Sequence, residues 1–453
     1  MAERIFGRAR RPRRIREALR QLISPNAPRA PMKTASHDMS HSLSPSKAAR
    51  SVAITLLPVM AAVLAGFLVV GAALPVLPLH VNHLGFGSIV VGMVAGTQFA
   101  ASLLSRVWSG AYSDTKGGKR AVVTGLVTAL VAGLLYVLSS VFESVPIISI
   151  AILLVGRAAL GGAESFIITG GVSWGLALVD PAHAGKVIAW VGTAMFAALA
   201  SGGPLGPMLF ASHGFVAIGA FSSVLPLLVL LLLVWAKGPL PRPRTAKSDV
   251  GSVIGAVWLP GVAAALSSIG YGAILAFGSL LYAIRHWEPI WLGFTAFGVA
   301  LIGVRVICGH LPDKFGGARV ALWFVLVQSA GLVLMGLAGG GATASIGAAL
   351  AGLGYSLVFP GLGVEAVRGV SPENRGLAMG LYTAFLDVAM AIGSPLLGWI
   401  ADRGGLSAVF IVSGAVTLCT AAIAARLLGS GRMTLPKLRR TAASSRRCRG
   451  TFR

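Results

Sequence analysis

The segment RVWSGAYSDTKGGKR, residues 106–120, is followed by RVICGHLPDKFGGAR, residues 305–319, at a spacing of 199 residues. Arg-Val, one Gly, one Asp and a Gly-Gly pair recur in register between the two copies. Each copy lies between two long apolar runs, which predicts a short charged hairpin between two membrane helices. The repeat therefore indicates that the chain is a duplicated, transporter-like helical body.

A second set of matches extends this duplication. The triplet VDP at residues 179–181 corresponds to VSP at 370–372, and Pro204 in SGGPLG corresponds to Pro395 in GSPLLG. Both pairs are 191 residues apart. Two landmarks in each half share one spacing, which indicates two copies of one helical unit.

The composition is typical of a chain that mostly faces lipid, since 55% of the 453 residues are hydrophobic, 11% are charged and 59 are glycine. Runs of about 20 mainly apolar residues can cross about 30 Å of hydrocarbon as helices. Such runs lie near residues 53–77, 87–108, 121–141, 147–170, 187–211, 215–236, 253–283, 290–310, 320–339, 344–368, 377–400 and 406–428. We therefore expect an all-α membrane protein with 12 transmembrane helices in two pseudo-symmetric six-helix bundles.

Basic residues gather in three segments, which divide the chain into five parts. Residues 1–50 contain 12 Lys or Arg, residues 429–453 contain eight, and the linker 237–252 adds four. The bundles are expected at 51–236 and 253–428. Because cytoplasmic loops are rich in Lys and Arg, both tails and the linker are predicted to be cytoplasmic. The first tail, rich in Arg, Pro and Ser, is expected to be disordered.

The net charge of +24 does not indicate a nucleic-acid-binding protein, because the tails lack interleaved aromatic residues and a folded basic surface. Their expected partners are anionic membrane lipids. Cys308, Cys419 and Cys448 do not form a disulfide or metal-ligand pattern, and His80 and His83 are an isolated pair. We therefore expect no metal, no cofactor and no enzymatic activity.

The two hairpins resemble the loop between helices two and three of the major facilitator superfamily, which has the pattern G-x-x-x-D-(R/K)-x-G-x-(R/K)-(R/K). The segments GRAALGGAESF, GYSLVFPGLG and YTAFLD are similar to the YhhS-like branch of bacterial facilitators. The matching hairpin positions are Gly110, Asp114, Gly117, Lys119, Arg120, Gly309, Asp313, Lys314, Gly316 and Arg319.

The resemblance implies a transporter of the bacterial inner membrane that moves a small-molecule substrate by alternating access and functions as a monomer. It also implies that the hairpins act as gate latches between conformations. Physically, glycine allows a tight turn between closely packed helices, and Asp114 and Asp313 can accept bonds at helix ends beside nearby bases. A static loop brace is the alternative.

Charged residues inside the hydrocarbon cost at least about 3 kcal/mol each, so they indicate a partner or a function. Arg157 and Glu164 lie seven residues apart on the expected fourth helix, which places them on one face. They form either a structural brace, through an ion pair or backbone hydrogen bonds, or a site that handles substrate or protons.

Asp387 lies near the middle of the expected eleventh helix, with no base on that helix within two turns. It belongs to a small and polar stripe formed by Gly380, Thr383, Asp387, Ala391 and Ser394. A desolvated carboxyl group in a cavity that meets each side in turn can bind and release a proton. We therefore predict that Asp387 couples transport to protons.

Three other charged residues lie closer to helix ends. Glu365 is expected at the cytoplasmic mouth, and Arg106 and Arg305 are expected to extend their charges toward the membrane surface by snorkelling.

The substrate is predicted from what the spans lack, since only Gln98 and Gln328 provide side-chain amides there. Gln98, Tyr271 and Tyr355 offer scattered hydrogen bonds beside the charged residues. A sugar needs a denser polar site, so an amphiphilic or small anionic organic solute fits better. The glycine-rich string 192–206 is compatible either with antiport or with a tightly packed, kinked helix.

Three functions remain open. The first is a proton-linked exporter of a small organic compound. The second is a proton symporter that imports an organic acid or sugar derivative, with Arg157 holding the anionic group. The third is a non-transporting membrane sensor or scaffold, or a membrane enzyme, which would need an extra domain or a catalytic cluster that the sequence does not show.

Overall fold

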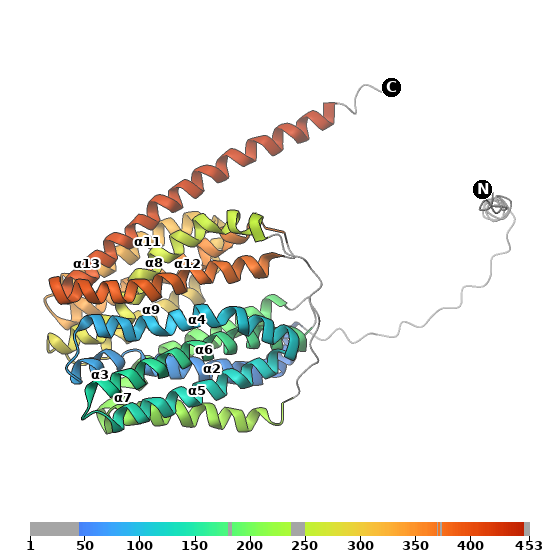
Figure 1. Ribbon diagram of the computed structural model, residues 1–453. Helices are drawn as coiled ribbons and strands as arrows, with labels where there is room; N and C mark the ends of the chain where they lie inside the picture. The colour runs from blue at the N-terminus through green and yellow to red at the C-terminus, as the bar shows by residue number, and fades with distance from the viewer. Residues whose placement is uncertain (1–44, 180–183, 237–249, 369, 372–373, 448–453) are drawn as a thin grey trace, which may run out of the picture. The chain divides into compact units, whose positions relative to one another are not determined.

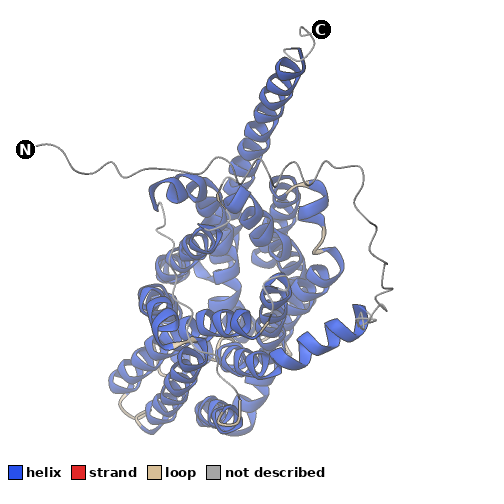
Figure 2. Cartoon of the chain, turned by 90° about the vertical axis from the view of Figure 1, so that its right-hand side faces the viewer, coloured by secondary structure: helices blue, strands red, loops and turns tan. Residues whose placement is uncertain are grey.

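The computed structural model describes residues 45–179, 184–236, 250–368, 370–371 and 374–447. Residues 50–453 form one compact unit, and residues 1–49 form a separate one. Of the smaller unit the structure describes residues 45–49, which begin the first described helix. The regular elements in the described ranges are helices (Figure 2). They confirm the expected all-α class.

The helices take the labels of Figure 1. They are α2 (Pro45–Ala73), α3 (Leu77–His83), α4 (Ser88–Lys116), α5 (Gly118–Val141), α6 (Pro146–Leu178), α7 (Ala184–Leu233), α8 (Val250–Ile284), α9 (Leu292–Cys308), α10 (Leu311–Phe315), α11 (Gly317–Gly336), α12 (Gly341–Arg368) and α13 (Arg375–Arg447).

The described residues contain nine helical segments long and apolar enough to cross a membrane. Two of them are pairs of helices joined at a kink, because α7 leaves helical geometry at His213 and Gly214 and α13 does so at Gly405. The φ angles of Gly214 and Gly405 are +68° and +75°, a conformation that favours glycine. With these kinks counted, and with the shorter apolar helix α9 added, the spans number twelve, as the sequence predicts.

The predicted tails and linker are described only in part. Residues 1–44 and 237–249 lie outside the described residues, and so does the expected disorder of the first tail. The helix α13 continues to Arg447, beyond the expected start of the second tail at residue 429.

The duplication is repeated in the way the helices pack. A β-carbon placed on Gly161 of α6 would lie 2.0 Å from the carbonyl oxygen of Gln98 in α4. One placed on Gly352 of α12 would lie 2.2 Å from the carbonyl oxygen of Phe297 in α9. The two glycines are 191 residues apart and their two partners are 199 apart, which are the spacings found in the sequence. The same helix crossing is therefore built twice.

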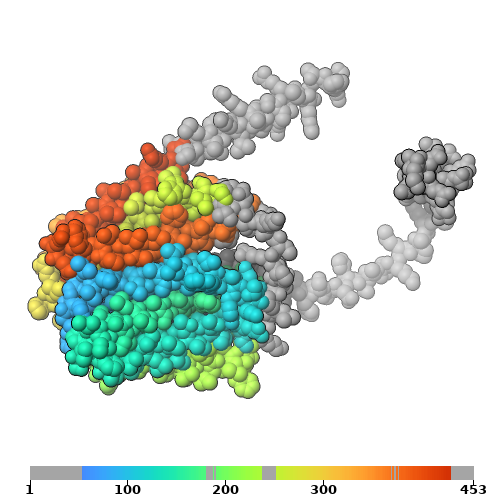
Figure 3. All heavy atoms as spheres, viewed as in Figure 1, coloured from blue at the N-terminus to red at the C-terminus, as the bar shows by residue number. Residues whose placement is uncertain are grey.

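A hydrogen bond is also repeated at these crossings. The Ser165 hydroxyl donates to the carbonyl oxygen of Ser102 at 2.7 Å, and the Ser356 hydroxyl donates to that of Leu301 at 2.7 Å. The two halves meet where α4 packs against α13 and where α7 packs against α9. Figure 1 shows α4 alongside the first part of α13, and the space-filling view in Figure 3 shows that the two make a continuous surface.

Candidate functional site

Asp387 is buried and is paired with a base from the other half of the molecule. Its Oδ2 accepts a charge-assisted bond from Nη2 of Arg106, which lies on α4. Nη1 of Arg106 donates to the Thr383 hydroxyl at 2.6 Å. Only 25% of the Arg106 side chain is exposed, so the expectation that it snorkels to the surface is wrong. The spacing of charged residues along one helix gives no sign of this pair, because Arg106 and Asp387 lie on different helices, 281 residues apart.

Arg305, the repeat counterpart of Arg106, also reaches across the halves. Its guanidinium carbon lies 3.9 Å from the ring centre of Phe196 on α7, and its Nη2 donates to the carbonyl oxygen of Ser356 at 3.2 Å. Snorkelling is therefore also the wrong description of Arg305. A guanidinium over an aromatic face makes a cation–π contact.

These two arginine contacts occupy equivalent places in the repeat. Arg305 follows Arg106 by 199 residues, and Asp387 follows Phe196 by 191 residues. Both spacings are those that relate the two halves elsewhere. A salt bridge on one side of the molecule is therefore replaced by a cation–π contact on the other.

Glu164 and Arg157 do not pair with each other. Nε2 of Gln98 donates to Oε2 of Glu164 at 2.8 Å. Arg157 is fully buried and donates through Nε to the carbonyl oxygen of Val94 at 3.2 Å and through Nη1 to the Tyr136 hydroxyl at 3.4 Å. These bonds brace α6 against α4 and α5, and they leave Nη2 of Arg157 without a partner among the described residues.

The second half carries no such groups at the equivalent positions. At a spacing of 199 residues from Gln98 and of 191 from Glu164 stand Phe297 and Tyr355. Arg157 is replaced by Ala348 at the latter spacing. The charged and amide groups are thus confined to the first half of a duplicated helix crossing.

Aromatic side chains take their place in the second half. The rings of Tyr271 and Tyr355 stack with centres 4.7 Å apart and planes 5° from parallel, and the ring of Phe297 lies 5.8 Å from that of Tyr271. The hydroxyl groups of Tyr355 and Ser268 are 3.2 Å apart. The predicted hydrogen-bonding residues Tyr271 and Tyr355 therefore form one apolar stack.

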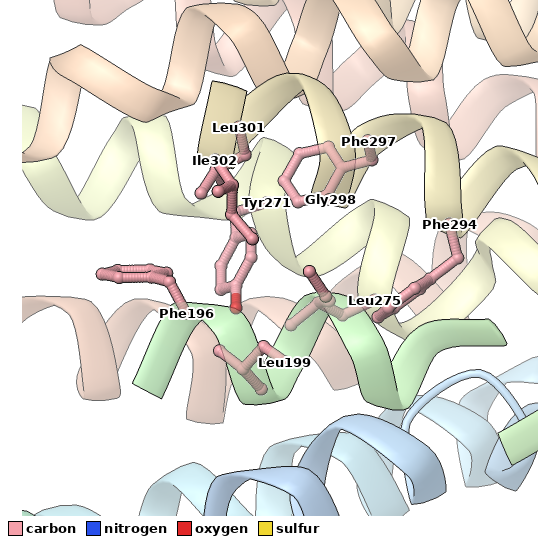
Figure 4. Close-up of a pocket in the computed structure, with 10 residues that line it drawn as sticks. Phe196, Leu199, Tyr271, Leu275, Phe294, Phe297, Gly298, Leu301 and Ile302 are labelled. Atoms are coloured by element: carbon pink, nitrogen blue, oxygen red, sulfur yellow. The ribbon is translucent and has the colours of Figure 1, made fainter. Parts of the chain in front are cut away.

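A small cavity lies beside this stack, between α7 of the first half and α8 and α9 of the second. Its volume is about 20 Å³, close to what one ordered water needs. Figure 4 shows the Tyr271 hydroxyl pointing toward α7. The lining includes Phe196, Leu199, Tyr271, Leu275, Phe297 and Ile302.

The hairpin glycines lie where the sequence requires them. Gly117 and Gly316, which end α4 and α10, have φ angles of +95° and +91°. A β-carbon on Gly118 would lie 2.4 Å from the backbone nitrogen of Trp174, and one on Gly317 would lie 2.1 Å from the carbonyl oxygen of Gly361. Both hairpins therefore need glycine for the turn and for close packing.

The charged hairpin residues make fewer contacts than expected. Asp114 and Asp313 are exposed, and within the described ranges neither has a basic partner within 4.0 Å. Lys119 donates to the carbonyl oxygen of Ala236, three residues beyond the end of α7, at 2.6 Å. The other matching residues lie on α4 (Gly110), α5 (Arg120), just after α9 (Gly309), on α10 (Lys314) and on α11 (Arg319).

Two carboxylates cap helices, and one of them was not anticipated. Glu365 accepts from the backbone N–H of Ala318 at 3.0 Å, at the start of α11. Asp402 of α13 accepts from the backbone N–H groups of Ser88 and Ile89 at 2.8 and 3.2 Å, at the start of α4. Asp402 thus joins the two halves at the end of α4 opposite the hairpin.

The glycine-rich string of α7 packs against α2. A β-carbon on Gly206 would lie 1.9 Å from the carbonyl oxygen of Ala72, and one on Gly202 would lie 2.6 Å from the backbone nitrogen of Ala72. These contacts support close packing as the role of the string.

The sequence of this chain is similar to those of known membrane transporters. A family model described as Major Facilitator Superfamily matches residues 59–364 and 295–447. The chain is 40% identical over 387 residues to an uncharacterized MFS-type transporter, STM4428, of Salmonella typhimurium, covering 85% of this chain and 99% of that protein. It is 36% identical over 356 residues to the uncharacterized MFS-type transporter YhhS of Escherichia coli, covering 77% of this chain and 86% of that protein.

Two solved structures share the fold. One is a mutant of the nucleoside transporter NupG, with a TM-score of 0.68 and 12% identity over 82% of this chain and 99% of that one. The other is the human organic anion transporter MFSD10, with a TM-score of 0.60 and 18% identity over 83% of this chain and 99% of that one.

Proposed function

The chain belongs to the major facilitator superfamily, a family of non-enzymatic transporters, and on this premise we propose that it exports a small organic solute in exchange for protons by alternating access. In this proposal it works as a monomer in the bacterial inner membrane. Both termini are cytoplasmic, where their basic residues meet anionic lipids.

The contact between Asp387 and Arg106 is the observation that carries the proposal. In the described part of the chain it is the one ion pair that joins the two halves, because the other two pairs, His80 with Glu143 and Glu365 with Arg368, each lie within one half. A buried ion pair is stable only while both partners are charged. Protonation of Asp387 therefore weakens the bond between α4 and α13.

This weakening gives proton binding a route to conformational change. With Asp387 neutral, Arg106 keeps its bond to Thr383 but loses its counter-charge, and α4 can separate from α13. Loss of the proton restores the pair and brings α4 and α13 together again. Proton entry and solute exit are thereby tied to the same movement.

Glu164 supplies a second carboxylate, which lies in the first half, whereas Asp387 lies in the second. The repeat itself supports a functional role for Glu164, because the equivalent crossing in the second half packs just as closely around Phe297 and Tyr355. Packing alone does not require an acid and an amide at these two positions. In the proposal Glu164 binds the solute or relays the proton while Gln98 orients it.

A second candidate function is proton-linked import of an organic acid. Nη2 of Arg157 favours it, because this donor is buried without a partner and could bind an anionic group. Membership in a family of non-enzymatic transporters argues against the third alternative, a sensor, scaffold or enzyme.

The proposal is tested in inverted membrane vesicles that hold an acidic interior. Adding an exported solute should release protons from the vesicles and build a solute gradient, which a pH-sensitive dye and solute counting would record. The variant Asp387→Asn keeps the side-chain volume but cannot carry the proton, so both signals should vanish while solute binding remains. If this variant still accumulates the solute fully, Asp387 is not the proton carrier and Glu164 takes that role.

A further inference from the structure

Arg305 is a guanidinium within the helical body that has no carboxylate to neutralise it. In the described ranges no Asp or Glu oxygen lies within 4.0 Å of it. Its partners are the neutral carbonyl oxygen of Ser356 and the face of the Phe196 ring. A buried or half-buried cation of this kind is costly unless something else supplies the missing charge.

The repeat shows which group is missing. Arg106, at the equivalent position, binds the carboxylate of Asp387, and Phe196 stands at the position equivalent to Asp387. The backbone around the two arginines is built alike, because the serine bonds and glycine contacts of both crossings match. The second site therefore has the arginine of the first without its acid.

An apolar cavity lies beside Arg305, and it is suited to the uncharged part of an organic anion. Phe196, which the guanidinium covers, also lines the cavity between α7, α8 and α9 (Figure 4). Leu301 and Ile302, one turn before Arg305, belong to the same wall. The other lining residues are almost entirely aliphatic or aromatic, and Tyr271 adds one hydroxyl group. A charged group at Arg305 would thus be continuous with an apolar compartment.

We infer that Arg305 binds the carboxylate of a small organic anion whose apolar, ring-sized body enters the cavity between α7 and α9. The ligand supplies to Arg305 the negative charge that Asp387 supplies to Arg106. The inference rests on the proposed function in one respect: the cavity holds only about one water as it stands, so the ligand enters when alternating access separates α7 from α9.

The substitution Phe196→Asp provides a direct test, because it places an acid where the repeat has Asp387. The introduced carboxylate should pair with Arg305 and compete with the ligand. Arg305→Gln removes the charge, and Phe196→Leu is the matched control, since it removes the ring but adds no charge. Thermal unfolding without ligand, measured for each purified variant, confirms that it is folded.

The measurement is equilibrium binding to the full chain in lipid nanodiscs. The probes are benzoate, 3-phenylpropanoate and 2-naphthoate, each compared with its neutral amide. At least one carboxylate should bind about tenfold or more tightly than its amide, and Arg305→Gln and Phe196→Asp should each remove that preference. Phe196→Leu removes the same ring contact from acid and amide, so it should lower both affinities together and keep the preference for the acid.

Two results would overturn the inference. One is that all three acids bind no better than their amides; the other is that Arg305→Gln keeps the preference for the acid, which would place the anion elsewhere, with Arg157 the leading alternative. Neither result affects proton-linked transport of another solute. Conversely, binding of the acid without any proton movement in vesicles would contradict the proposed function and leave the binding site standing.

Discussion

The two halves of this transporter share a backbone design but differ in the chemistry attached to it. The crossing of α4 with α6 and that of α9 with α12 have the same glycine contact and the same serine bond. Yet the first carries Gln98 and Glu164 where the second carries Phe297 and Tyr355. At this crossing the first half carries an acid and an amide, and the second half carries two aromatic rings.

This difference works as an internal control. The second half shows what the crossing needs in order to pack, which is glycine and serine. The crossing packs in the second half without an acid or an amide, so packing does not explain Gln98 and Glu164. The same reasoning separates Arg106, which has an acid, from Arg305, which has none. Polar groups present in only one copy of a repeat are therefore the first candidates for solute and proton handling.

The largest effect is expected where the halves are alike. Gly161→Leu and Gly352→Leu should each destabilise the protein by about 3 kcal/mol, because the first carbon of the new side chain already collides with a carbonyl oxygen. The abundance of the protein in the membrane and its midpoint temperature of thermal unfolding should fall to a similar extent in both variants. A severe loss in one and none in the other would show that the two crossings do not carry equal structural weight.

The next effect should appear in only one half. Glu164→Gln can still accept the bond from Gln98, so the variant should fold, but transport should drop by about tenfold or more because the charge is lost. Tyr355→Phe loses only the contact with Ser268 and should change transport by less than about threefold. Transport assays on equal amounts of folded protein measure the loss in each of the two variants. Similar losses in the two variants would remove the functional asymmetry between the halves.

A smaller effect is expected at the hairpins. Asp114→Asn keeps the size of the side chain and removes its charge, so it should slow turnover by a few-fold while the apparent affinity for the solute stays unchanged. Asp313→Asn is the repeat-matched comparison. A weakened affinity with unchanged turnover would instead assign Asp114 to the solute site.

The smallest effect concerns Asp402, which caps α4 from the opposite half. Asp402→Ala should cost about 1 kcal/mol, because two backbone N–H groups lose their acceptor but remain near water. Thermal unfolding measures this cost. Asp402→Asn, which keeps an acceptor oxygen, should recover part of it, and an equal loss in both variants would argue against a capping role.

The sequence was sufficient for the features that repeat or that follow from hydropathy. Twelve spans, the hairpin glycines and the duplicated register could all be read from spacing and composition. The partners of charged residues could not, because they come from helices far apart in the chain. Arg106 lies 281 residues from Asp387, and their pairing depends on how α4 meets α13. The spacing of 191 residues already relates Phe196 to Asp387. Only the structure shows that the two residues contact equivalent arginines, Arg305 and Arg106.

The central claim is that the charge on Asp387 controls the separation of the two halves, and the distance between the two hairpins tests it most directly. Spin labels at Lys116 and Lys314, both exposed, would be introduced after Cys308, Cys419 and Cys448 are replaced by serine. Pulsed electron paramagnetic resonance then gives the label distances. In the parent protein, lowering the pH should increase the population at long distance, and Asp387→Asn should show the long distance at every pH. A variant that retains the pH dependence of the parent would contradict the claim.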